Sequence, residues 1–263
     1  MKGNAYFCAA FAVLLLAGHA LAIRHHERPH RLSQGVSLST VQSPTFDLCP
    51  TCVSFTGQAL DILLNIILNS GVVGSCGTLC GELANKTGNK DLGVVCDLLC
   101  DYVGIKEFIK FIQNADLDPI YFCELLKVCK IVDNGDAKFT SLEVHPATGR
   151  RGRTFAIAFD WTTTNGTGTG EIVIEVITLD HLPVGTGNLI EPQQPGSYSG
   201  TASLSTDNSG CDPSQGPCEQ WLPGQYTVKV AICNGECGST HPHSQIYDMA
   251  EATFNITADA SRL

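Results

Sequence analysis

Cysteine spacing constrains the fold of this chain more than any other feature of its sequence. Two pairs, Cys76/Cys80 and Cys96/Cys100, each hold cysteines four residues apart. Residues at that spacing lie about one turn apart on the same face of a helix. Two antiparallel helices that each carry such a pair can be cross-linked twice. The spacing therefore predicts two helices held together by nested disulfides.

The same segment has four further cysteines at its ends. It opens with Cys49-Pro50-Thr51-Cys52 and closes with two cysteines six residues apart. Eight cysteines allow ~105 pairings, so the sequence alone does not fix the connectivity. We favour a nested arrangement because each bridge then repeats the geometry of its neighbour. The disulfides predicted on this basis are Cys49–Cys129, Cys52–Cys123, Cys76–Cys100 and Cys80–Cys96.

This pattern resembles the saposin B-type domain over about residues 45–131. The resemblance rests on the CxxC opening, the Cys-x5-Cys closing and an inner pair between them. The family usually has one cysteine pair fewer, so the additional pair here is expected to add a fourth bridge. The resemblance implies a disulfide-stapled domain of four or five helices. Helices after the first are predicted over 75–84, 91–102, 105–112 and 118–129, with a bend at Gly104.

The first helix, over residues 53–68, has more apolar residues than a surface helix needs. Four polar residues form a narrow stripe along it, and nearly all other positions are apolar. A surface helix is apolar on one face only, so we expect this helix to be buried from two sides. Its second cover would be a lipid, a membrane or a second copy, and the alternative is a helix clamped between its neighbours. The candidate lipid-binding residues, here and in 105–112, are Ile62, Leu63, Ile66, Ile67, Phe108, Ile109, Phe111 and Ile112.

The N-terminus predicts a secreted protein, either extracellular or in the lumen of an endolysosomal vesicle. Lys2 precedes an apolar run over residues 6–18, and Ala20-Leu21-Ala22 supplies a cleavage pattern, so residues 1–22 are predicted to be a removed signal. The run is shorter than the ~18 residues that a membrane span needs. Removal also takes Cys8, which leaves an even number of cysteines in an oxidising compartment. Disulfides are favoured there over metal sites or catalytic thiols.

Two segments are predicted to lie outside the folded domains. Residues 23–44 have little apolar content and predict a disordered arm or pro-segment. The histidines of this arm are interpreted as part of a solvated tail rather than as metal ligands. Asp133-Asn134-Gly135-Asp136 is a turn-forming linker whose likeness to a calcium loop stops after four residues.

Strand patterns follow the linker. Alternating or β-branched residues predict strands over 139–145, 154–161, 170–178, 225–232 and 252–257. The stretch 181–224 is rich in Gly, Pro and Ser and is expected to hold one or two short strands. This pattern predicts an immunoglobulin-like β-sandwich over 138–258, so that the whole chain has an α + β two-domain fold.

Several positions in the chain are candidates for covalent modification. The pairing of the four C-terminal cysteines is left open between two local bridges and a cross-link from the long loop to a strand; they are Cys211, Cys218, Cys233 and Cys237. Sequons predict glycosylation at Asn85, Asn165 and Asn255. The basic patch Arg150-Arg151-Gly152-Arg153 is interpreted as an exposed turn, with a processing site as the alternative.

Charge and motif content exclude several functions. Residues 49–131 hold six Lys and nine Asp or Glu with no His, and residues 132–263 hold six Lys or Arg against fifteen Asp or Glu. Nucleic acid is therefore not an expected partner, because phosphate attracts basic surfaces. The sequence contains no G-x-S-x-G, H-E-x-x-H or P-loop motif, and His241-Pro242-His243 is interpreted as a loop. We therefore expect a non-enzymatic protein with no metal or cofactor.

The C-terminal half carries a second resemblance. The stretches Trp221–Val228 and Cys233–Ser239, together with the preceding helical module, look like the countin-like secreted proteins of amoebae. The resemblance implies an extracellular factor that influences cell adhesion or group size.

Three functions stay open at this point. The chain is a lipid- or membrane-binding module, a membrane-permeabilising effector, or a protein-directed signalling factor that binds no lipid. The expected partners are a lipid or membrane surface and either a second copy or an extracellular protein complex.

Overall fold

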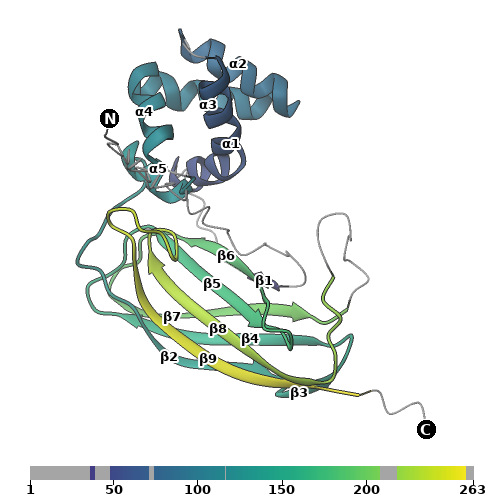
Figure 1. Cartoon of the computed structure of the whole chain (residues 1–263). Coiled ribbons are helices and arrows are strands. Elements are labelled where there is room, and N and C mark those ends of the chain that lie inside the picture. The colour runs from purple at the N-terminus through teal and green to yellow at the C-terminus, as the bar shows by residue number, and fades with distance from the viewer. Residues whose placement is uncertain (1–35, 39–47, 71–73, 116, 208–217, 259–263) are drawn as a thin grey trace, which may run out of the picture. The chain divides into compact units, whose positions relative to one another are not determined.

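The structure is a computed structural model that describes residues 36–38, 48–70, 74–115, 117–207 and 218–258. Helices occupy the first part of the described chain and strands most of the remainder (Figure 1). The predicted signal at 1–22 lies outside the described residues, as do most of the predicted arm and Cys211.

Five helices follow one another within residues 48–125. They are α1 (Leu48–Ser70), α2 (Cys76–Thr87), α3 (Lys90–Val103), α4 (Ile105–Ala115) and α5 (Pro119–Leu125). Side-chain oxygens cap three of the starts: Ser75 accepts from Thr78 N at 3.2 Å, and Asp118 accepts from Tyr121 N at 2.8 Å. Asn89 accepts from the first amides of α3. Such caps satisfy amides that have no partner within the helix.

Disulfides join the two ends of the helical region and its middle pair of helices. The bridges are Cys49–Cys129, Cys52–Cys123, Cys76–Cys100 and Cys80–Cys96, the four pairings that the spacing predicts. The α2–α3 pair also packs closely, because a Cβ at Gly93 would lie 2.8 Å from the Cβ of Ala84. Glycine there allows the helix backbones to approach.

The end of the last helix differs from the prediction. α5 ends at Leu125 rather than at Cys129. Lys127 has a φ of 60°, and the amides of Val128 and Cys129 both donate to the carbonyl of Cys123. The chain therefore turns back tightly, which brings Cys129 to its partner at the start of α1.

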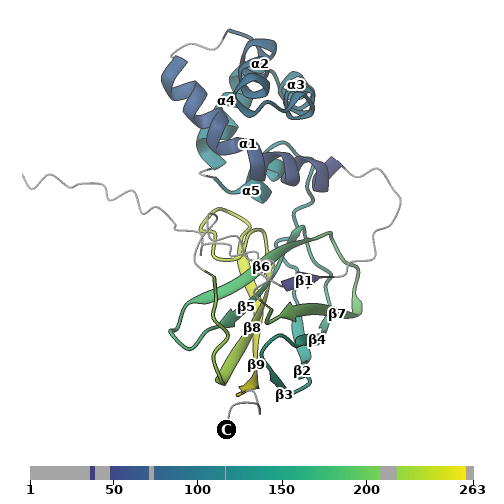
Figure 2. The same cartoon turned by 90° about the vertical axis from the view of Figure 1, so that its right-hand side faces the viewer.

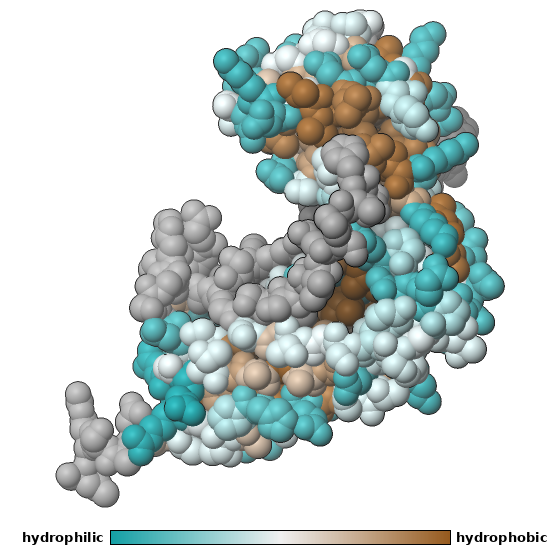
Figure 3. All heavy atoms as spheres, turned by 180° about the vertical axis from the view of Figure 1, so that it is seen from behind, coloured by the Kyte–Doolittle hydropathy of each residue, from teal (hydrophilic) through white to brown (hydrophobic). Residues whose placement is uncertain are grey.

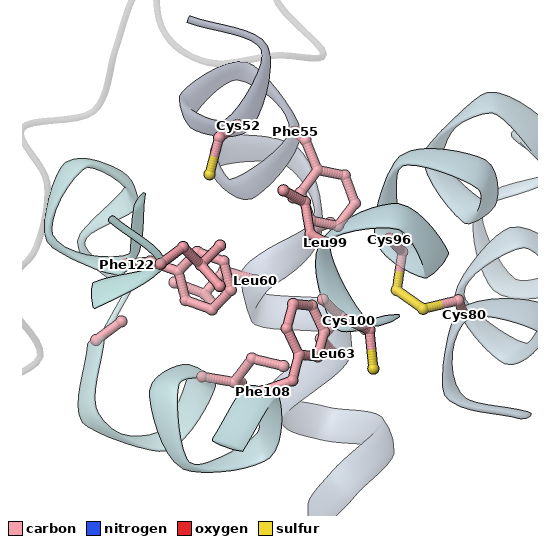
Figure 4. Close-up of a cluster of buried hydrophobic side chains, with 14 of the residues drawn as sticks. Cys52, Phe55, Leu60, Leu63, Cys80, Cys96, Leu99, Cys100, Phe108 and Phe122 are labelled. Carbon is pink, nitrogen blue, oxygen red and sulfur yellow. A yellow bond between two sulfur atoms is a disulfide. The ribbon is translucent and has the colours of Figure 1, made fainter. Parts of the chain in front are cut away.

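Apolar side chains from all five helices fill one core. Figure 4 shows Phe55, Leu60, Leu63, Phe108 and Phe122 with neighbouring cysteines inside it. The rings of Phe108 and Phe122 meet edge to face, with centroids 5.6 Å apart. This geometry is favourable for aromatic pairs.

Two sheets form the second part of the described chain (Figure 2). One has the order β1-β7-β4-β2 and the other the order β3-β9-β8-β5-β6. All pairings within them are antiparallel except that of β3 with β9. The strands are β1 (Val36–Leu38), β2 (Lys138–His145), β3 (Thr148–Arg150), β4 (Thr154–Thr163), β5 (Gly170–Ile177), β6 (Pro183–Ile190), β7 (Gly196–Ser205), β8 (Gly224–Asn234) and β9 (Gln245–Thr257).

A single apolar core takes residues from both sheets. Phe155, Ile157 and Phe159 contribute to it from β4, and Tyr226 and Val228 contribute from β8. The two sheets therefore bury one face each against a shared interior. The two-part α + β architecture is confirmed, and the immunoglobulin-like topology stays a prediction.

The stretch 181–224 contains β6 and β7, of which β7 pairs with β4 over ten residues. Gly200 of β7 lies directly opposite Phe159, and a Cβ at Gly200 would lie 2.3 Å from the ring. The missing side chain makes room for the phenylalanine. A glycine that weakens the strand signal in the sequence is thus required by the packing.

The predicted disordered arm holds one short strand. β1 pairs in antiparallel register with β7, Val36 opposite Leu204 and Leu38 opposite Ala202. The prediction of disorder is wrong at these three residues, because the outer edge of β7 offers main-chain partners that the local sequence does not show.

Candidate functional site

The residues predicted to face lipid lie in or against the core of the helical region. Leu63, Ile66, Ile67, Phe108 and Ile112 belong to the buried core, and Ile62, Ile109 and Phe111 are partly buried against it. Ile66 and Ile67 are only 1% and 7% exposed, so neither presents its side chain to solvent, and lipid binding by these residues stays a prediction. These side chains are covered because α1 contacts all four other helices. The sequence alternative, a helix clamped between its neighbours, describes α1 better.

The length and composition of α1 raise the question of whether this helix could cross a membrane. Residues 48–69 are long and apolar enough to cross a membrane by these two criteria, and 44% of the apolar window within them is buried in the fold. A core helix of a soluble protein passes the same test. The apolar content of α1 therefore does not by itself indicate a membrane span.

Exposed apolar surface instead gathers on α3. Val94, Leu98 and Tyr102 are each between 60% and 67% exposed, and they recur every four residues. We call these three residues the α3 apolar stripe. The opposite face of α3 carries Cys96 and Cys100, which are disulfide-bonded into the core. Figure 3 shows brown, apolar surface on the helical part of the chain.

Acidic residues flank the stripe. Asp91 and Asp101 are exposed on the same helix, and Asp97 is half-buried. A membrane with anionic headgroups would be repelled by these carboxylates, whereas a neutral headgroup would not. Sequence reasoning missed the stripe because it considered α1, which has the longest apolar run. The spacing of Val94, Leu98 and Tyr102 marks one apolar face of the helix, but it does not tell whether that face is inner or outer.

A second group of polar side chains links the helical region to the strand region. Asp118 accepts from Ser239 Oγ at 2.6 Å, and the rings of Tyr121 and His241 stack with centroids 4.4 Å apart. His243 Nδ1 lies 2.6 Å from a carboxylate oxygen of Asp133. The predicted His241–His243 loop is a loop, but both of its histidines contact residues more than a hundred positions away. Nothing local in the sequence indicates these contacts.

Glu124 is buried beside this group. It is 4% exposed, and its Oε1 has no hydrogen-bond partner among the described residues. Burial first, and then the negative charge of Asp118, raise the pKa of Glu124 to about 7. A carboxyl with such a pKa changes charge near neutral pH.

The candidate modification positions among the described residues are exposed or already bonded. The sequon residues Asn85, Asn165 and Asn255 are exposed, as are the three arginines of the 150–153 turn. Cys233 bonds to Cys237, which is one local bridge, and Cys218 is also disulfide-bonded. Asp136 of the linker accepts from the amides of Thr164 and Asn165, and these bonds lower the pKa of its carboxyl. Asp136 thus shapes the loop that presents Asn165.

Among the described residues, no group of three or more His, Cys, Asp or Glu is placed to hold a metal ion. Within those residues the distinctive features are an exposed apolar stripe, a buried carboxyl and a disulfide framework.

Comparison with known proteins decides the family. Residues 47–127 match the countin N-terminal domain, and residues 137–261 match the countin C-terminal domain. Countin-1 of Dictyostelium discoideum is 40% identical over 218 residues, which cover 82% of this chain and 81% of Countin-1. This chain belongs to the countin family.

Other countins show a similar likeness. Countin-3 of the same organism is 36% identical, and the alignment covers 79% of this chain and 89% of Countin-3. Countin-2 is 37% identical, and the alignment covers 82% of this chain and 81% of Countin-2. Among solved structures, the C-terminal domain of Wzt is 14% identical to this chain, with a TM-score of 0.36. The match covers 50% of this chain and 79% of the Wzt chain. That likeness is too distant to carry an argument.

The two family domains coincide with the two parts of this countin. All five helices begin within the N-terminal domain match, and β2 to β9 lie within the C-terminal domain match. The α3 apolar stripe therefore lies in the countin N-terminal domain. Asp133, the partner of His243, lies between the two matched ranges.

Proposed function

We propose that this countin-family protein is a secreted, non-enzymatic factor that docks on lipid surfaces through the α3 apolar stripe and thereby affects cell adhesion or group size. The single observation that carries the proposal is the exposure of Val94, Leu98 and Tyr102 on one face of α3. The predicted signal and the disulfides support secretion, because disulfides persist in oxidising compartments. The resemblance to saposin B-type domains favours a lipid over other partners.

The size of the stripe also favours a lipid surface. Its three residues span about 12 Å of helix, since each residue rises ~1.5 Å. A stable interface with a second protein needs roughly 800 Å² per partner, which is far more than three side chains supply. Tyr102 stands at the C-terminal end of the stripe. Tyrosine is enriched where a protein meets the membrane–water boundary, because its ring is apolar and its hydroxyl is polar.

Vesicle flotation tests the proposal. Leu98→Asp should lower binding of the secreted protein to phosphatidylcholine vesicles at least about tenfold, because burying one leucine contributes ~1.5–3 kcal/mol. Gln113→Asp is the matched control, since it adds the same charge at an exposed position of α4 and should bind as wild type does. Both proteins should be secreted normally.

The alternatives give other results. A permeabilising effector would release a trapped dye from the same vesicles, with leakage that increases at acidic pH. A factor directed only at proteins would neither float with vesicles nor carry extracted lipid. Equal vesicle binding by wild type and Leu98→Asp would show that the stripe is not the docking surface.

A further inference from the structure

A pocket of about 370 Å³ opens in the strand region, and none of its lining residues belongs to the α3 apolar stripe. Its walls come from the turn between β5 and β6 and from the segment that leads into β8. Leu179, Leu182 and Leu222 supply apolar surface, and Asp180 and Glu219 supply carboxylates. The volume lies within the range of roughly 300–1,000 Å³ that small-molecule sites occupy.

The three leucines are unusually exposed for residues around one opening. Leu179, Leu182 and Leu222 are between 40% and 55% exposed. Single exposed leucines need no explanation, but several gathered about one hollow indicate an interaction site. Their apolar surface would be covered if a ligand entered.

Hydrogen bonds hold the walls in place without a ligand. The amide of Leu182 donates to Thr178 Oγ1 at 3.1 Å, which closes the turn that carries Leu179 and Asp180. On the other wall, Tyr226 Oη donates to the carbonyl of Leu222 at 2.9 Å. Because these groups are already ordered, a ligand would not bear the entropy cost of ordering them.

The two carboxylates set the charge of the pocket. The amide of Trp221, a buried residue, donates to Glu219 Oε1 at 3.2 Å, and the hydroxyl of Thr178 donates to Asp180. Burial raises the pKa of Glu219, and the charge of Asp180 raises it too. Among the described residues no Lys or Arg forms an ion pair with either carboxylate, and His181 acts only weakly on Asp180. A ligand cation would relieve the repulsion between Asp180 and Glu219.

We propose that this pocket binds an apolar body that carries one amine or guanidinium group. The apolar body would cover Leu179, Leu182 and Leu222, and the cation would lie between Asp180 and Glu219. A free organic amine and a lysine or arginine side chain beside an apolar residue share this chemistry. The pocket contains no residue of α3. The proposal that it binds a ligand is therefore independent of the proposal that α3 docks on lipid.

Calorimetric titration of the whole secreted protein tests the pocket. Octylamine is the probe, with octanol and octanoate as neutral and anionic controls of equal chain length. Octylamine should bind about tenfold more tightly than octanol and more tightly still than octanoate. The capped peptide acetyl-Leu-Lys-amide is titrated in parallel. Tighter binding of the peptide indicates that the natural ligand is a protein side chain, and tighter binding of octylamine indicates a free amine.

Substitutions then locate the binding. Glu219→Gln should lower octylamine affinity about tenfold and leave octanol affinity unchanged, whereas Glu191→Gln, an exposed acid outside the pocket lining, should change neither. Asp180→Asn is a second variant with the same expectation, in case Glu219→Gln does not fold. Octanoate binding as tight as octylamine binding, or full octylamine affinity in the pocket variants, would overturn the proposal.

Discussion

At the scale of single residues, Glu124 is the most consequential ionisable group. Its side chain is buried near Asp118, Asp133 and His243, and its pKa is raised from 4.5 to about 7. A carboxyl with a raised pKa in the folded state stabilises the fold when protonated. That contribution is fully present below pH 4.5 and is lost as the pH rises toward 7.

The stability of this protein should therefore fall between pH 5 and pH 8. We expect Glu124→Gln to remove about 2 kcal/mol of that fall, because glutamine stays neutral across the range. Denaturant unfolding at the two pH values measures the effect, with the exposed Glu191→Gln as control. The same pH dependence in Glu124→Gln and wild type would rule out Glu124 as its source.

At the scale of elements, the contact between α2 and α3 depends on the absence of a side chain. A Cβ at Gly93 would lie 2.8 Å from the Cβ of Ala84 and 3.2 Å from the carbonyl oxygen of Cys80. Neither helix can move aside, because two disulfides join them. Real Cβ atoms essentially never approach another atom to 2.8 Å, and a contact of 3.2 Å is already tighter than most.

Gly93→Ala should destabilise the protein by about 1–2 kcal/mol through overpacking, although alanine favours helix formation. Gly81→Ala on α2 is the matched control, since no atom lies within 4 Å of its added Cβ. That variant should gain about 0.5–1 kcal/mol. Chemical denaturation measures the free energy of unfolding of the two variants. A Gly93→Ala protein more stable than wild type would contradict the close packing of α2 and α3.

At the scale of the whole molecule, disulfides tie distant parts of the sequence together. Thirteen cysteines become twelve if the predicted signal with Cys8 is removed. Cys49–Cys129 spans 80 positions of the chain, whereas Cys80–Cys96 spans 16. Constraining a longer loop lowers the entropy of the unfolded chain more.

Thiol counting under denaturing, non-reducing conditions should find no free thiol in the secreted protein. Replacing Cys49 and Cys129 together by alanine should cost about 4–5 kcal/mol, against about 3 kcal/mol for Cys80 and Cys96 together. The unfolding free energies of these two double variants provide the comparison. Two or more free thiols in the wild type would overturn the twelve-cysteine framework.

The sequence predicted those features that local spacing determines. The pairing of Cys76 with Cys100 follows from residues one helical turn apart, and the strands β4 and β8 follow from alternation. Features that depend on distant partners were not predictable. β7 was hidden because Gly200 is needed only where Phe159 packs against it, and Asp133 lies 110 positions from His243.

The candidate site shows the same division. The sequence shows that α1 is unusually apolar, but only packing decides that Ile66 and Ile67 are covered by other helices of the same chain. The exposed positions on α3 have ordinary amphipathic spacing, which does not distinguish an inner face from an outer one. The three-dimensional arrangement of the helices was therefore needed to find the stripe.

Fluorescence quenching by brominated lipid tests the central claim most directly. Tyr102→Trp keeps an aromatic ring in the α3 apolar stripe, and the wild type, whose tryptophans Trp161 and Trp221 are buried, gives the background. Phosphatidylcholine vesicles brominated on their acyl chains should quench the emission of the introduced tryptophan and leave that background nearly unchanged. Vesicle binding without quenching of the introduced tryptophan, or no binding at all, would contradict docking through α3.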